Sequence, residues 1–333
     1  MGALVAETSI EWTDRTWNPV RGCSRVSEGC RNCYAERMAA RFSGTRPGES
    51  PWRGGTLPDD PFFGFAEMTK AGPRWTGRVE LIPGKLDEPL RWRKPQRVFV
   101  NSMSDLFHES LDFHDIAAVY GVMSSASHHT FQILTKRPAR RREFFRWMCA
   151  LSGDDLTAGD SGVKTMATDP VFGAEMAAGN RGVRFGARSP DNINRAWPLP
   201  NVWEGVSVED QKTKDERVPL LLGTPAAKRF VSYEPALGPV DFTGWLYSCD
   251  GDCSQPAHEV TPTLSWVIVG GESGPGARPF DVAWARATVA QCKAAGVACF
   301  YKQGGAANHC AHDAKGGHFE CFPEDLRVRE FPA

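Results

Sequence analysis

Seven short runs of β-branched and aromatic residues recur along the chain, and polar residues follow each run. The runs are SIEWT from Ser9, RVFVNSMSD from Arg97, TFQILTKR from Thr130, VWEGVSVED from Val202, RFVSYEP from Arg229, SWVIVGGES from Ser265 and VACFYKQ from Val297. Their centres are mostly apolar at successive positions, which is typical of strands covered by helices on both faces. Strands alternating with helices predict an α/β fold with a parallel sheet, here a partial or full (βα) barrel.

Two of the intervening stretches carry helix-start signals. Asp112 precedes residues whose apolar members share one helical face: Phe113, Ile116, Ala117, Tyr120 and Met123. Asp281 precedes a second such set, which Gly296 ends: Val282, Ala285, Val289 and Cys292.

Two stretches do not fit the alternation. Residues 43–78 are rich in Gly, Pro and Trp, and residues 150–200 are rich in Gly, Ala, Asp and Asn. We expect both to be insertions or long loops. The 333 residues are then a single barrel domain over 1–333, with a Cys/His-rich extension over about 303–333.

Composition excludes several classes of protein. The 39 basic and 40 acidic side chains leave a net charge of −1, so a global polyanion-binding surface is not expected. No apolar run reaches the ~18 residues of a membrane span. The start, MGALVAETSIEWTD, lacks the basic residues and apolar core of a signal peptide. We therefore expect a cytoplasmic protein that has no contact with membranes.

Three of the ten cysteines share one segment, GCSRVSEGCRNCYAERMAARF, with the spacing C-x6-C-x2-C: Cys23, Cys30 and Cys33. This segment leads into an expected helix whose apolar side includes Tyr34, Met38 and Phe42. Three thiolates on one loop can hold three corners of an iron–sulfur cluster and leave the fourth iron open. The spacing alone also allows a zinc site completed by a distant residue, or three buried thiols that bind nothing.

Polar residues at the ends of the later runs are the second candidate site, because (βα) barrels carry their functional groups there. These candidates are Ser104, Asp105, Lys136, Ser207, Glu209, Glu234, Gly270, Gly271 and Glu272. The two glycines leave room for a ligand, and Glu272 can accept hydrogen bonds from an ammonium group. Lys136 and Arg137 can hold a carboxylate or a phosphate, with a solvated turn as the alternative.

Four further cysteines, with histidines between them, suggest a second metal site: Cys249, Cys253, Cys310 and Cys321. Such a site would hold zinc or an auxiliary cluster. Its alternative is a surface loop with unrelated cysteines.

Basic and aromatic residues alternate in RWRKPQR (91–97) and KRPARRREFFRW (136–147). Both stretches can follow a nucleic-acid backbone while their rings stack on bases. A solvated helix face is the alternative interpretation.

The segment GCSRVSEGCRNCYAERMA resembles the cluster loop of radical S-adenosylmethionine enzymes, including the aromatic residue after the last cysteine. It departs from the usual C-x3-C-x2-C loop by three residues. TWNPVRGC, NSMSDLFHE, LTKRP, GVSVEDQ, SYEPALGPVDF and VIVGGESGPGARP are similar to a phage- and bacteria-associated radical-SAM-like family of unknown function. That family distantly resembles spore photoproduct lyase. The similarity runs from about Trp12 to about Lys302, without the insertions.

The resemblance implies a barrel of radical-SAM type and a [4Fe–4S] cluster bound by Cys23, Cys30 and Cys33. The open iron would chelate S-adenosylmethionine, and its cleavage would give methionine and a 5′-deoxyadenosyl radical. On strand order, Ser104 and Asp105 suit the methionine end, and Ser207 and Glu209 suit the ribose. An electron donor such as flavodoxin or ferredoxin is implied, and DNA or a nucleotide becomes a candidate substrate. A peptide or small-metabolite substrate, or a non-catalytic metal-stabilised binding protein, are the alternatives.

Overall fold

The computed structural model describes six stretches of the chain: residues 8–43, 62–151, 170–185, 197–246, 263–305 and 315–333. The chain divides into two compact units. Unit 1 comprises 1–25, 35–203 and 225–227, and unit 2 comprises 26–34, 204–224 and 228–333. Strand β8 (Val202–Val208) begins in unit 1 and continues in unit 2. The single-domain prediction therefore stays a prediction.

The sheet of unit 1 is parallel. Its strands β1 (Arg15–Trp17), β6 (Arg97–Val100) and β7 (Thr130–Thr135) lie in that order. Thr16 pairs with Phe99, and Phe99 in turn pairs with Gln132. The start of β8 follows β7, since the Phe131 N–H donates to the Asn201 carbonyl at 2.8 Å.

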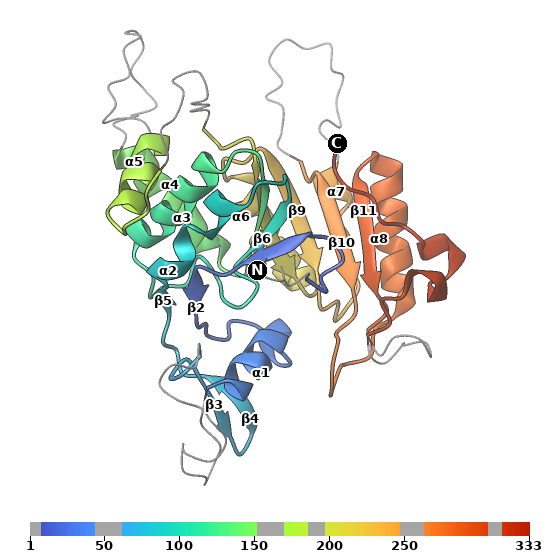
Figure 1. Cartoon of the computed structure of the whole chain (residues 1–333). Helices are drawn as coiled ribbons and strands as arrows, with labels where there is room; N and C mark the ends of the chain where they lie inside the picture. Colours follow the sequence, from blue (N-terminus) through green and yellow to red (C-terminus); the bar gives the residue numbers. More distant parts are fainter. Residues whose placement is uncertain (1–7, 44–61, 152–169, 186–196, 247–262, 306–314) are drawn as a thin grey trace, which may run out of the picture. The chain divides into compact units, whose positions relative to one another are not determined.

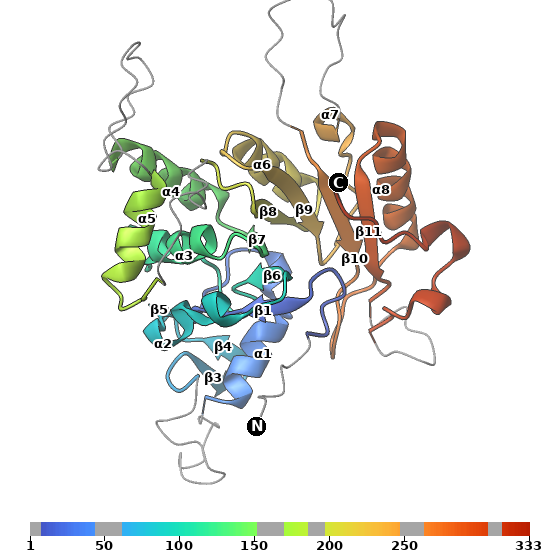
Figure 2. The ribbon, with the colours of Figure 1, turned by 45° about the horizontal axis from the view of Figure 1, so that its top comes forward.

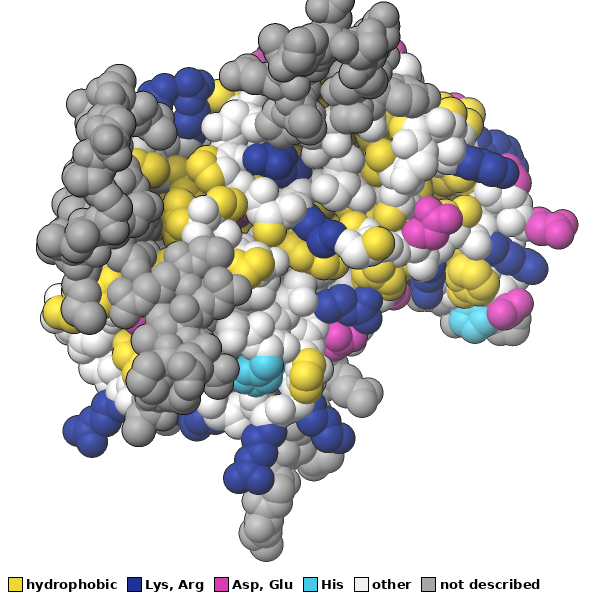
Figure 3. Space-filling view, turned by 90° about the horizontal axis from the view of Figure 1, so that it is seen from above, with side chains coloured by type: hydrophobic (Ala, Val, Ile, Leu, Met, Phe, Trp, Pro, Cys, Tyr) yellow, Lys and Arg dark blue, Asp and Glu magenta, His cyan; other side chains and the backbone are white. Residues whose placement is uncertain are grey.

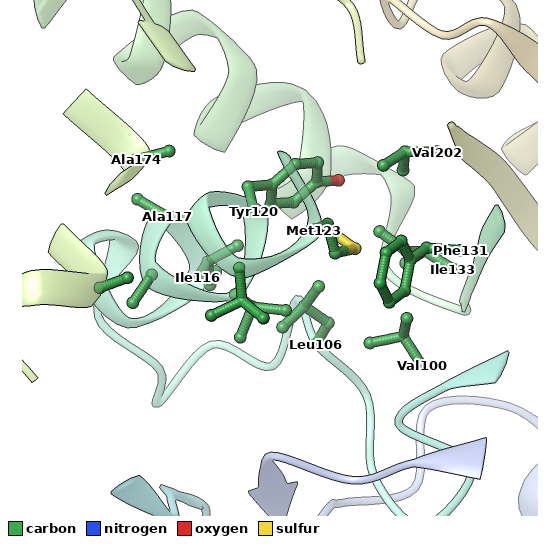
Figure 4. Packing of buried hydrophobic residues seen from close by; sticks show 14 of the residues in the cluster. Val100, Leu106, Ile116, Ala117, Tyr120, Met123, Phe131, Ile133, Ala174 and Val202 are labelled. Carbon is green, nitrogen blue, oxygen red and sulfur yellow. The ribbon is translucent and has the colours of Figure 1, made fainter. Parts of the chain in front are cut away.

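Three helices of unit 1 contribute apolar side chains to the same core as this sheet: α3 (Phe113–Ser125), α4 (Pro138–Leu151) and α5 (Pro170–Gly179). Figure 4 shows Ile116, Tyr120 and Met123 of α3 on the same side as Phe131 and Ile133 of β7. These five side chains are at most 1% exposed. The apolar face expected from the sequence of α3 is therefore confirmed as core.

Smaller elements of unit 1 complete it. They are the antiparallel pairs β2 (Val20–Arg21) with β5 (Glu80–Leu81) and β3 (Ala66–Thr69) with β4 (Gly72–Trp75), and the helices α1 (Tyr34–Arg41) and α2 (Pro83–Leu86). A 3-10 turn covers Glu88–Arg91.

Unit 2 continues the same alternation of strands and helices. After β8 come β9 (Lys228–Tyr233), β10 (Trp266–Gly270) and β11 (Ala298–Gln303), and β10 pairs in parallel with both of its neighbours. Its helices are α6 (Gln211–Leu222), α7 (Thr243–Leu246) and α8 (Val282–Ala295), and 3-10 turns cover Glu28–Cys30, Phe319–Cys321 and Glu324–Leu326. Figures 1 and 2 show α8 packed along β11.

Both helix-start predictions are confirmed. The carboxylate of Asp112 accepts a hydrogen bond from the N–H of His114, and that of Asp281 accepts one from Ala283 at 2.8 Å. Gly296 ends α8 in the left-handed conformation, with φ of 66°. These caps satisfy amide groups that a helix leaves unpaired at its ends.

Six of the seven expected strands form as β6 to β11, and the predicted parallel α/β architecture is confirmed. The first expected strand, from Ser9, is wrong, because the first strand of the sheet is Arg15–Trp17. Residues 11–12 form a turn instead, closed by the Thr13 N–H on the Ile10 carbonyl. The ring of Trp12 lies 4.7 Å from that of Phe99, so its burial does not require an extended chain.

The expected insertions contain regular structure in their described parts. Residues 66–75 form the β3–β4 hairpin, and residues 170–179 form α5, which packs on α3. Of the two alternatives for 150–200, an insertion or a long loop, the insertion accommodates α5, whose alanines Ala174, Ala177 and Ala178 are buried. The extension also packs: Phe322 and Leu326 lie in the core of unit 2. Among the described residues, no helix is long and apolar enough to cross a bilayer.

The close packing of α3 on α5 gives a test of this fold. A Cβ at Gly121 would lie 2.2 Å from the backbone carbonyl oxygen of Ala174. We expect Gly121→Ala to lower the free energy of unfolding by about 1–3 kcal/mol, because the two helices must separate. Gly173→Ala is the control, since a Cβ there meets nothing within 4 Å. Urea unfolding of both variants measures the difference, and equal stabilities would contradict the packing.

Candidate functional site

In unit 1, the chain leading to Cys23 lies against the carboxyl ends of β6 and β7. The Oγ of Ser104, just after β6, donates to the Val20 carbonyl at 3.0 Å, and Ser104 forms a parallel bridge with Gly22. The guanidinium of Arg137, just after β7, donates to both the Oγ and the carbonyl of Ser24, at 2.8 and 3.1 Å. Residues 20–24 are thereby fixed to two strand ends.

Arg137 is the centre of this arrangement. Its Nη1 lies 3.9 Å from the Sγ of Cys23 and 3.2 Å from the carboxylate of Asp105, and its Nε donates to Glu109 at 2.9 Å. Burial acts to lower the pKa of the guanidinium, but the charges of Asp105, Cys23 and Glu109 outweigh burial and raise it. Arg137 is therefore a permanent buried cation, whose side chain is only 4% exposed.

Asp105 is the carboxylate that balances this cation. It accepts the hydroxyl of Thr135 at 2.7 Å and the backbone N–H groups of Phe107 and Lys136 at 3.0 and 3.1 Å. With Arg137, four groups donate to its two oxygens, so Asp105 has a structural role here. Lys136 is partly exposed.

His108 adds a neutral partner for Ser24. Its Nδ1 accepts the N–H of Ser110 at 3.1 Å, so the neutral ring carries its proton on Nε2 and donates to the Ser24 Oγ at 2.8 Å. Burial and the nearby charge of Arg137 lower the pKa of His108. The ring is therefore uncharged at neutral pH and does not compete with Arg137 for the carboxylates.

In unit 2, the segment that carries Cys30 and Cys33 contacts the strand ends of β8 and β10. The Ser27 hydroxyl donates to Glu209, just after β8, at 3.0 Å. Glu209 is buried and also accepts two hydrogen bonds from Arg217 at 3.1 and 3.0 Å. A Cβ at Gly29 would lie 2.3 Å from the same carboxylate, so only glycine permits this approach.

Glu272, just after β10, makes the second contact with that segment. It accepts the side-chain amide of Asn32 at 2.9 Å and two hydrogen bonds from the guanidinium of Arg278 at 3.0 and 2.7 Å. Burial acts to raise the pKa of Glu272, but the hydrogen bonds from Arg278 and Asn32 outweigh it and lower the pKa. Arg278 also donates to the Glu28 carbonyl at 3.0 Å, so it holds the segment directly.

The remaining candidates of unit 2 also contact other parts of the protein. Glu234 pairs with Lys302 at 3.0 Å, and the buried Ser207 accepts Arg217 at its carbonyl. A Cβ at Gly270 would lie 2.9 Å from Glu234, and one at Gly271 would lie 2.8 Å from the Gly304 carbonyl oxygen. The missing side chains of these glycines thus make room for the protein itself. The prediction that they admit a ligand is not supported by this packing.

The cysteines of the triplet are partly exposed and are not in disulfides. Cys23 belongs to unit 1, and Cys30 and Cys33 belong to unit 2, where the Cys33 N–H donates to the Cys30 carbonyl at 3.4 Å. Within the described stretches, no three His, Cys, Asp or Glu side chains are grouped so as to hold a metal ion. The three thiols, which lie within eleven residues of the sequence, are of the ligand type that iron–sulfur clusters use.

The second cysteine cluster stays a prediction. Cys249, Cys253 and Cys310 lie outside the described residues. Cys321 is in a disulfide, so its sulfur is not a thiolate ligand in this structure.

Four of the ten basic side chains proposed to contact nucleic acid make contacts inside unit 1, and five others are exposed: Arg91, Arg93, Lys94, Arg142 and Arg146. Arg137 and Arg141 are buried, Arg97 pairs with Asp14 at 2.8 Å, and Arg140 lies 3.9 Å from the ring centre of Phe113. On the face drawn in Figure 3, uncharged and apolar side chains separate the lysines and arginines of the described residues. Contact of these two stretches with nucleic acid therefore stays a prediction.

Sequence reasoning missed five polar side chains that bind within the cysteine segment or support its contacts: Ser24, Asn32, His108, Arg217 and Arg278. Arg217 stands eight residues after its partner Glu209, inside α6, and no local spacing rule pairs a strand end with that helix position. For Arg278 the signal was closer, since it follows Glu272 by six residues.

Comparison with known proteins gives one family. The model of a family described as Protein of unknown function (DUF5131) matches residues 7–321, nearly the whole chain. The match includes all three cysteines of the triplet. Neither the curated proteins nor the solved structures searched give a match.

The buried ion pair of unit 1 yields a quantitative prediction. Arg137→Leu removes the cation from an Asp105 side chain that is only 8% exposed, and we expect a loss of about 3–5 kcal/mol in the free energy of unfolding. Arg91→Leu is the matched control, because Arg91 and Asp87 are 58% and 39% exposed, and it should cost under about 1 kcal/mol. Urea unfolding of both variants tests this prediction. Equal losses in the free energy of unfolding would show that Arg137 is not the central contact.

Proposed function

The chain belongs to this DUF5131 family of proteins of unknown function, and we propose that it is an iron–sulfur enzyme of the radical S-adenosylmethionine type. Cys23, Cys30 and Cys33 would hold a [4Fe–4S] cluster in a partial (βα) barrel. When reduced by a protein donor, such a cluster supplies the electron that cleaves S-adenosylmethionine to methionine and a 5′-deoxyadenosyl radical.

One observation supports this proposal above the others. The cysteine loop has two arms, one in each unit: the residues up to Ser24, which include Cys23, and the residues from Ser27, which include Cys30 and Cys33. Each arm is bound to the carboxyl ends of parallel strands in its own unit. Arg137 holds the arm of Cys23, and Glu209 and Glu272 hold the arm of Cys30 and Cys33. Since enzymes built from (βα) units carry their reactive groups at this end, the loop is where catalysis is expected.

The side chains around the loop suit a cluster that must stay intact in water. The Arg137 guanidinium, 3.9 Å from the Cys23 Sγ, stabilises a thiolate there, and thiolate is the form in which cysteine binds iron. The paired carboxylates Asp105, Glu209 and Glu272 are each bound by an arginine, so they do not compete for the metal. The three sulfurs remain as the iron ligands.

We propose the reaction and its cofactors without a substrate. A zinc-stabilised binding protein is the alternative that the cysteine chemistry permits, and it predicts a different metal content.

Anaerobic reconstitution with iron and sulfide tests the proposal. We expect the wild-type chain to bind about four iron atoms and to release 5′-deoxyadenosine from S-adenosylmethionine after reduction with dithionite. Cys30→Ala should lose most of the iron and all of the release, because a cluster needs its three thiolates. Cys149→Ala, which removes a partly exposed cysteine of α4, should behave as the wild type.

The outcome against the proposal is equally clear. Tightly bound zinc with no iron in the wild type, or iron retained in full by Cys30→Ala, would rule out the cluster. Circular dichroism of Cys30→Ala, compared with the wild type without iron, separates loss of the ligand from loss of the fold.

A further inference from the structure

Helix α1 has its large apolar side chains on the outside. Its buried residues are Ala35, Glu36, Ala39 and Ala40, and the two later alanines pack with Ala66 of the β3–β4 hairpin. Tyr34, Met38 and Phe42, spaced by four residues, are 46%, 39% and 43% exposed. The sequence predicts these three as the apolar side of the helix, and in the structure that side is exposed.

The orientation of α1, with its large apolar side chains exposed, has a local cause. Glu36 is 1% exposed and forms an ion pair with Arg25, and its carboxylate also accepts the backbone N–H of Trp75 at 3.0 Å. A buried charge must keep its partners, so the side of α1 that carries Glu36 has to face the hairpin. The alanines beside Glu36 allow the close approach, and the larger side chains are left outside.

The exposed side of α1 carries positive charge as well as apolar area. Arg41 is exposed and Arg37 partly so, and Glu36, the one acidic residue of the helix, is buried. Aromatic residues, methionine and arginine are the residue types enriched in protein–protein interfaces. Aromatic, methionine and arginine side chains lie next to one another on this side of α1. They therefore indicate a binding surface for a protein whose own contact surface has acidic groups at its rim.

The position and the small size of this exposed surface indicate which class of protein would bind it. The surface begins at the residue that follows Cys33, and the eight residues of α1 extend about 12 Å. Contacts between electron-transfer proteins are among the smallest specific interfaces, below about 1,200 Å². A nucleic-acid strand would require more cations along its path than two arginines supply.

We propose that the exposed side of α1, made by Tyr34, Arg37, Met38 and Arg41, together with Phe42 directly after the helix, is the docking surface for an acidic electron-transfer protein. This inference rests on the proposed function, because a redox centre in the cysteine loop gives such a protein its reason to bind here. The donor then delivers its electron beside Cys33.

Binding of oxidised flavodoxin to the full-length chain tests the surface directly. We expect calorimetry at low salt to show binding that weakens as salt is added, because charges steer the contact. Phe42→Ser and Arg41→Glu should each weaken binding at least about tenfold, as expected for residues central to an interface. Neither substitution touches the cysteines or the buried side of α1.

Matched controls exist in the same unit. Met176→Ser removes a methionine of α5 that is 51% exposed, and Arg142→Glu reverses an exposed arginine of α4. Both should bind flavodoxin as the wild type does. No binding by the wild type, or equal binding by all four variants, overturns the proposal.

Binding of a different molecule to the exposed side of α1 would give different results and would also overturn the docking proposal. Single-stranded DNA that binds through Phe42 and Arg41 and displaces flavodoxin would identify a nucleic-acid surface. Dimerisation of the wild type that Phe42→Ser abolishes, without flavodoxin binding, would identify a second copy of the chain.

The two proposals fail separately. A chain that binds no iron but binds flavodoxin through α1 refutes the cluster and leaves the docking surface. A chain that binds iron but binds flavodoxin independently of α1 refutes the docking surface alone.

Discussion

Ion pairs between arginines and buried carboxylates at strand ends are the interactions on which the cysteine loop depends. Arg137 with Asp105 does this in unit 1, and Arg217 with Glu209 and Arg278 with Glu272 do it in unit 2. Each pair also binds a polar group of the loop, so the loop cannot move without leaving a buried charge partly unsatisfied. The cost of such a charge holds Ser24 at the strand ends of unit 1, and Ser27 and Asn32 at the strand ends of unit 2.

These ion pairs change how the polar side chains at the strand ends are interpreted. Side chains there ordinarily suggest ligand contacts, yet Asp105, Glu209 and Glu272 have their oxygens occupied by arginine, amide and hydroxyl donors. With their arginines, these carboxylates hold the cysteine segment in place. The thiols of Cys23, Cys30 and Cys33 stay partly exposed, as the proposed cluster requires.

Helix α1 shows the same principle on the surface. The buried Glu36 and its partner Arg25 decide which side of the helix faces the hairpin, and they override the hydrophobic pattern. A cluster of apolar side chains exposed to water commonly marks a site where another molecule binds. Its place directly after Cys33 links the orientation of one helix to the electron supply that the proposed chemistry needs.

The sequence by itself determined the parallel α/β architecture, six strands, two capped helices and the cysteine segment, because apolar periodicity and capping act over neighbouring residues. Only the tertiary structure decided that Glu209 pairs with Arg217, that Glu272 binds Asn32 across 240 residues, and that α1 faces outward. A carboxylate after a strand can satisfy itself with a ligand or with a distant arginine. The choice depends on which groups the fold brings within about 3 Å, and no local pattern encodes that distance.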